Sequence, residues 1–94
     1  MLKYLQEHIK EELEGAEDYM SKAIEYRDTC NGNKFYNMAM MELEHANCLT
    51  KMFSSMEKPE KVSYEEYSKM YQEILDSYST SMGKLEAMKK LYWN

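Results

Sequence analysis

Apolar residues recur every three or four positions along most of the chain, which is the spacing of one face of an α-helix. In the first part of the chain they stand at Leu5, Ile9, Leu13, Ala16, Met20, Ala23 and Ile24. This pattern predicts a helix over about 2–28, followed by a turn over 29–33. We expect Gly32 or a neighbouring asparagine to take the left-handed conformation in that turn. A second helix is then predicted over about 34–56.

The last third of the chain predicts one more helix. Pro59 lies in the charged segment 57–61 and stops the second helix from continuing. Ser63 is a good N-cap residue, and Glu66 three positions later completes a capping-box pattern. Apolar side chains then recur on a broad stripe as far as Tyr92, so the third helix is expected over about 63–92. The chain is therefore predicted to be a single all-α domain, 1–94, of three long helices.

Composition and charge exclude several classes of partner. The net charge is −5 and the longest basic cluster is Lys89-Lys90, which argues against a nucleic-acid partner. The longest apolar run, 38–41, is far shorter than a membrane span. Cys30 and Cys48 are expected too far apart for a disulfide, with Cys48 as a buried free thiol. This favours a reducing compartment, and we expect a cytoplasmic protein.

Glu42 and His45 carry the candidate chemistry of the second helix. They are three residues apart, so they are neighbours on the helix surface and can bind the same metal ion. They share a stripe with apolar residues: Phe35, Met38, Met41, Leu49, Met52 and Met56. A carboxylate and an imidazole among apolar side chains are costly unless they are paired or bind a metal. The sequence leaves both interpretations open, a hydrogen-bonded pair or a pair of metal ligands.

Glu12 is the best-oriented carboxylate that the first helix offers. On a helical wheel it lies about 60° from the centre of the apolar stripe, whereas Glu17 lies about 80° from it. Glu11 and Glu14 point well away from that stripe. His8 is expected to be a surface imidazole on the flank of the helix.

The predicted turn places Glu12 at the wrong level for Glu42. With a turn at 29–33, the residue opposite Glu42 in an antiparallel hairpin is near position 20, about 12 Å along the helix from Glu12. Either a second copy of the chain brings Glu12 to the site, or the turn is misplaced. Glu17 is the fallback ligand on axial level alone.

Two segments resemble a known superfamily. Residues 10–19 read KEELEGAEDY and residues 35–46 read FYNMAMMELEHA. The Glu-Glu-Leu-Glu run, Tyr19 seven positions after Glu12, the interval of 30 positions to Glu42 and the Glu-His-Ala ending are similar to ferritin-like proteins. The similarity covers roughly 5–55 and is greatest to the encapsulated ferritins and rubrerythrin-type di-iron proteins.

The resemblance implies a site and an activity. Glu12, Glu42 and His45 would be catalytic iron ligands, completed by the same residues of a second subunit. Glu11 and Glu14 would match outer carboxylates on the route by which iron enters. The implied protein is a ferroxidase that binds two iron ions per dimer, with manganese or zinc as alternative metals. It would oxidise ferrous iron with dioxygen or peroxide.

The resemblance also implies an assembly. The first two helices would form a ferritin-like antiparallel hairpin that pairs with a second subunit into a four-helix bundle, with the third helix alongside. Apolar stripes on three long helices also favour a homodimer or higher homo-oligomer, because one small bundle cannot bury them all. The segment 90–94, KLYWN, does not look like a shell-targeting tail, so no shell protein is expected as a partner. The alternative function is a metal-free helical oligomerisation or interaction module that keeps the hairpin.

Overall fold

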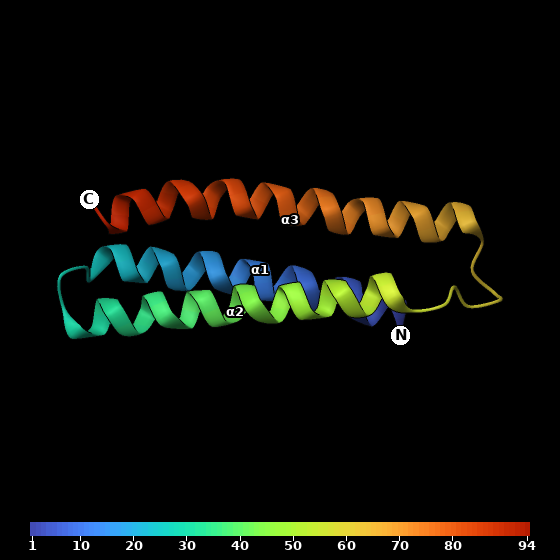
Figure 1. Cartoon of the computed structure of the whole chain (residues 1–94), viewed down its shortest axis with the longest axis horizontal. Helices are drawn as coiled ribbons and strands as arrows, with labels where there is room; N and C mark the ends of the chain where they lie inside the picture. Colours follow the sequence, from blue (N-terminus) through green and yellow to red (C-terminus); the bar gives the residue numbers. More distant parts are fainter.

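Three long helices make up the protein. The computed structural model describes residues 1–94 and contains α1 (Leu2–Glu25), α2 (Cys30–Ser55) and α3 (Tyr64–Tyr92). Helices α1 and α2 form an antiparallel hairpin, and α3 runs back alongside it, antiparallel to α2 (Figure 1). The molecule is an elongated rod with principal extents of 51 × 18 × 15 Å. The predicted all-α architecture with an antiparallel hairpin is confirmed.

The loop between α1 and α2 lies earlier in the chain than predicted. Thr29 is the N-cap of α2, because its hydroxyl oxygen accepts a hydrogen bond of 3.0 Å from the Gly32 backbone N–H. The residue with positive φ is Asp28, at 65°, and not Gly32 or an asparagine. Gly32 lies inside α2, where a Cβ atom would collide with the carbonyl oxygen of Tyr26. The predicted helix limits at 28 and 34 are therefore wrong, since the Thr29 cap starts α2 at Cys30.

This shift of the loop sets the alignment of the hairpin. Gly15 on α1 lies opposite Glu42 on α2, and Glu12 lies opposite His45. The predicted separation between the levels of Glu12 and Glu42 is therefore wrong. No second copy of the chain is needed to bring Glu12 to Glu42.

The core is built around α1, which buries seven residues: Leu2, Leu5, Ile9, Leu13, Ala16, Met20 and Ala23. Helix α2 turns Ala39, Leu43, Ala46 and Phe53 toward this core. Small alanine side chains allow two helix backbones to approach closely, which favours this side of α2 over the methionine-rich one. Three methionines of the apolar stripe are consequently exposed: Met38, Met41 and Met52. Phe35, Leu49 and Met56 of the same stripe are partly buried against the core.

Helix α3 packs mainly on α1. The predicted cap at Ser63 is confirmed, because its hydroxyl accepts a hydrogen bond of 3.1 Å from the Glu66 backbone N–H. Ile74 and Leu85 are the apolar residues that α3 buries completely, and Ser81 is buried beside them. None of the three helices has an apolar stretch long enough to span a bilayer.

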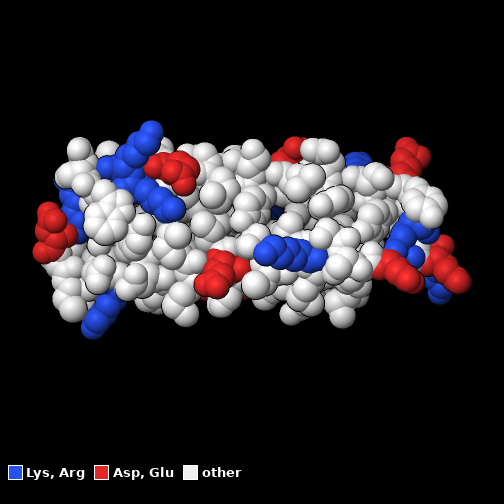
Figure 2. All heavy atoms as spheres, viewed as in Figure 1, with Lys and Arg blue, Asp and Glu red and all other residues white.

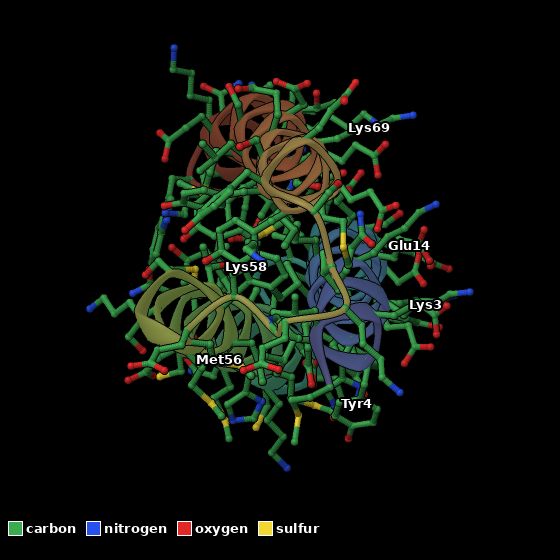
Figure 3. The ribbon with its side chains drawn as sticks, turned by 90° about the vertical axis from the view of Figure 1, so that its right-hand side faces the viewer. Lys3, Tyr4, Glu14, Met56, Lys58 and Lys69 are labelled. Carbon is green, nitrogen blue, oxygen red and sulfur yellow. The ribbon has the colours of Figure 1, made fainter.

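Aromatic contacts join α3 to α2 near the two ends of the rod. At one end the ring of Phe53 stacks on Tyr67 and Tyr71, with centroid distances of 5.5 and 5.9 Å. At the other end Tyr36 stacks on Tyr92 at 4.7 Å. Figure 2 shows uncharged side chains over most of the viewed face, with acidic and basic side chains clustered at its two ends and a few near its middle. Seen along the rod, α3 covers one side of the hairpin and leaves the opposite side open (Figure 3).

Candidate metal centre

Glu12, Glu42 and His45 converge across the hairpin. One carboxylate oxygen of each glutamate and one ring nitrogen of His45 lie within 4.8 Å of one another. Helix α1 provides Glu12, and α2 provides Glu42 and His45 one turn apart. Nδ1 of His45 is 3.7 Å from Oε2 of Glu12. A single chain therefore assembles the three residues singled out in the sequence, and their role as metal ligands stays a prediction.

Gly15 makes room for the carboxylate of Glu42. A Cβ atom at position 15 would lie 3.0 Å from Oε2 of Glu42, which is closer than ordinary van der Waals contact. Glycine in a helix interior costs about 1 kcal/mol relative to alanine, so its presence in α1 needs a structural reason. The close approach of Glu42 to the backbone of α1 supplies that reason. A glycine in the middle of a strongly periodic helix is the sequence signal for this contact.

The two carboxylates share a partly buried and electrostatically unfavourable position. Only 16% of the Glu12 side chain is exposed, and its Oε2 atom is buried without a hydrogen-bond partner. The pKa of the Glu42 carboxyl is raised above its ordinary value of 4.5. The main cause is a hydrogen bond with Glu12 that the protonated form makes, followed by burial and by repulsion from the Glu12 charge, while His45 and His8 act in the opposite direction. The pair therefore favours either a shared proton or a cation between the carboxyl groups.

His8, which the sequence suggested to be a surface imidazole on the flank of the first helix, lies beside this group. Its Nε2 atom is 3.7 Å from Oε1 of Glu12, and its Nδ1 atom is 3.4 Å from Oε2 of Glu11. Tyr4 stacks on the imidazole with a centroid distance of 5.3 Å and an interplanar angle of 15°. The spacing of four residues between His8 and Glu12 on one helix was the signal for this contact.

Glu17, the fallback ligand, lies on the other side of α1. Its carboxylate accepts a hydrogen bond of 2.8 Å from the Ser81 hydroxyl and lies 3.4 Å from Nζ of Lys84 on α3. Five residues along a helix correspond to a rotation of about 140°, so Glu12 and Glu17 cannot face the same ion. The fallback assignment is wrong, because axial level alone ignored this rotation.

The two other acidic candidates on α1 also differ in their surroundings. Glu14 lines a groove between α1 and α3 together with Glu17 and Asp76, and Figure 3 shows it pointing from α1 away from α2. Glu11 is exposed and faces His8. A role for either residue on an iron route stays a prediction.

The centre opens onto an exposed apolar surface, here called the methionine face: Tyr4 on α1 and Met38, Met41 and Met52 on α2. Met41 and Met52 are 55% and 51% exposed, and they share a helical stripe with His45. In Figure 3, sulfur atoms gather on the side of the hairpin opposite α3, where Tyr4 also points. Cys48 is an exposed free thiol near this stripe and not the buried one predicted. Thus the candidate metal centre lies where a partner can reach it.

The donor set fits a divalent transition-metal ion. Two carboxylates and one imidazole provide the mixed oxygen and nitrogen ligands that suit iron, manganese and zinc. Oε2 of Glu12 is a buried acceptor without a hydrogen-bond partner, and either a proton on Glu42 or a bound cation would satisfy it. Three protein ligands leave further coordination positions for a second copy, solvent or an oxidant.

The sequence also matches a known protein family. The sequence model of the family described as Rubrerythrin matches residues 3–94, and so spans all three helices. No match was found among curated proteins or among solved structures. The match includes α3, which the similarity seen in the sequence did not reach.

Proposed function

Because the chain belongs to the rubrerythrin family of ferritin-like proteins, we propose that it is a di-iron protein that oxidises ferrous iron with dioxygen or peroxide. Two copies join through their methionine faces and hold two iron ions between their hairpins. The observation that carries this proposal is the convergence of Glu12, Glu42 and His45 around a buried oxygen that has no hydrogen-bond partner.

Each of the three residues has a distinct task in this proposal. Glu12 and Glu42 supply hard oxygen donors that stabilise the ferric state, and His45 supplies the nitrogen donor. Two ferrous ions provide two electrons, which with two protons reduce dioxygen to hydrogen peroxide or peroxide to water. Below the raised pKa of Glu42 the pair holds a proton, and a cation that binds between the two carboxyl groups would then displace it.

The exposure of the methionine face supports the dimer. A large apolar patch on a small protein marks an interaction surface, and methionine side chains adapt readily to a second surface. His45 lies at this patch with 55% of its side chain exposed, so it can reach an ion shared with a second copy. Helix α3 lies on the opposite side of the hairpin and leaves the patch accessible.

Anaerobic titration with ferrous iron tests the proposal. Tight binding should saturate near one iron per chain, and oxygen should then produce a near-ultraviolet charge-transfer band. Glu12→Gln should abolish the tight binding of ferrous iron. Glu17→Gln, on the same helix but facing α3, should keep it. Absence of tight binding in the unmodified protein would overturn the proposal and favour the metal-free assembly module, which would use the same exposed face.

A further inference from the structure

We propose that His8 and Oε1 of Glu12 form an outer metal position, distinct from the inner group of Glu12, Glu42 and His45. The ligand is a divalent transition-metal ion. This inference rests on the proposed function, because the outer position shares Glu12 with the inner group.

The two oxygens of Glu12 face two different imidazoles. Oε2 lies 3.7 Å from Nδ1 of His45, and Oε1 lies 3.7 Å from Nε2 of His8. Ligand atoms around a tetrahedrally bound ion are roughly 3.4 Å apart for bond lengths of about 2.1 Å. Each nitrogen–oxygen pair therefore needs to close by only a few tenths of an ångström to bind one ion. A carboxylate placed between two imidazoles in this way is able to bridge two ions.

Glu11 orients the His8 ring. Its Oε2 atom lies 3.4 Å from Nδ1 of His8, which favours a proton on Nδ1 and leaves the lone pair of Nε2 directed toward Glu12. Histidines that bind metals commonly donate their second N–H group to a carboxylate in this manner. Glu11 is thus a positioning residue for His8, and it does not itself touch the ion.

Tyr4 fixes the plane of the same ring. Its phenol ring lies nearly parallel to the imidazole, at 15°, and covers one side of it. The His8 side chain is still 39% exposed, whereas Oε2 of Glu12 is buried. The outer position is therefore accessible to solvent. A nitrogen donor beside a carboxylate selects transition metals over calcium and magnesium, which prefer oxygen ligands.

A simpler role for His8 is to carry a positive charge between Glu11 and Glu12. The two roles make opposite demands on the side chain. If His8 acts only through a positive charge, lysine can replace it, because lysine keeps the cation. If His8 binds a metal ion, lysine cannot replace it, because a protonated amine has no free lone pair.

Nitrogen NMR of the imidazole rings during titration with Zn²⁺ distinguishes these roles. The chain has two histidines, so each ring can be assigned by replacing the other. We expect the nitrogens of His45 to shift in a first step and Nε2 of His8 to shift in a second, weaker step. Calorimetric titration with Zn²⁺ does not depend on the His8 signal, and in it His8→Lys and His8→Gln should both lose the second step. Glu11→Gln should weaken it roughly tenfold. Glu7→Gln, an exposed neighbour of His8, is the matched control and should keep both steps.

The outcomes separate this inference from the proposed function. A shift of His45 with no change at His8, even in excess Zn²⁺, overturns the outer position alone. A second binding step of full strength in His8→Lys also overturns it. No shift at either histidine overturns both the outer position and the proposed function.

Discussion

Oε2 of Glu12 lies 3.7 Å from Nδ1 of His45 across the α1–α2 hairpin. The contact depends on the loop at 26–29, because each residue by which an antiparallel loop is displaced changes the facing partners by two. Thr29 fixes that loop by capping α2. The Thr29 cap therefore contributes to the alignment in which two candidate metal ligands meet.

Replacing His45 should remove most of the metal affinity. His45→Ala deletes the one nitrogen donor of the inner group and leaves two carboxylates that repel each other. We expect the affinity for ferrous iron to fall roughly 100-fold or more, since a ligand is lost rather than a supporting contact. Isothermal titration under anaerobic conditions measures this change.

Glu44→Ala is the matched control for His45→Ala. Glu44 is exposed on the same helix and is not part of the converging group. Its replacement should leave the iron affinity nearly unchanged. Equal losses in the two variants would show that the side of α2 assigned to the metal is incorrect.

Gly15→Ala should change stability and metal binding in opposite directions. Alanine is favoured over glycine in a helix interior by about 1 kcal/mol, so the metal-free protein should gain up to that amount. The added methyl group would approach Oε2 of Glu42 to 3.0 Å and push this carboxylate away from α1. We expect weaker iron binding together with a higher melting temperature, measured by calorimetry with and without iron. Stronger binding in the variant would contradict the role assigned to Gly15.

The stability of the metal-free protein should depend on the protonation of Glu42. Its pKa is raised in the folded state from an ordinary value of 4.5, chiefly by the hydrogen bond with Glu12. At pH values between the ordinary pKa of Glu42 in the unfolded state and its raised pKa in the folded state, the folded protein therefore binds more protons than the unfolded one. The stability from this group is complete below pH 4.5 and is lost as the pH rises through the raised pKa.

Glu42→Gln isolates this effect from the other carboxylates. Glutamine donates to Glu12 without needing a proton, so the metal-free variant should be more stable than the unmodified protein at neutral pH. The difference between the two free energies of unfolding, measured in urea, should grow as the pH is raised from about 4.5 to 7. A difference that stays constant over this range would argue against the shared proton.

A charge on the methionine face should separate the two copies of the dimer. Met41→Lys places an ammonium group on the proposed interface, where it would have to be desolvated. Because Met41 is exposed, the monomer should fold normally. Sedimentation velocity should show a shift from dimer to monomer, accompanied by loss of tight iron binding. Leu75→Lys, at an exposed apolar residue of α3, should leave the dimer intact.

The fold was largely predictable because its signals are local. Helical periodicity gave three helices, and the Ser63 cap was visible as a sequence pattern. The first loop was misplaced because Thr29 and Gly32 suit both a turn and the start of a helix. The sequence alone does not show that a Cβ atom at position 32 would meet the Tyr26 carbonyl, which depends on the path of the chain.

The site was predictable in its residues and not in its arrangement. The orientation of Glu12 on the helical wheel singled it out correctly as the α1 carboxylate that faces His45. Its distance from Glu42 depended on the hairpin alignment, which a small error in the loop changes by several residues. Periodicity alone does not distinguish the two sides of α2, because Met41 and Ala39 both count as apolar. The structure buries Ala39 against α1 and leaves Met41 exposed.

The most direct test of the central claim is a crystal structure of the protein soaked with ferrous iron, with anomalous data at the iron edge. We expect anomalous peaks bounded by Glu12, Glu42 and His45, at an interface where two methionine faces meet. A map with no peak near these residues, or with iron bound only by other carboxylates such as Glu14 or Glu17, would contradict it.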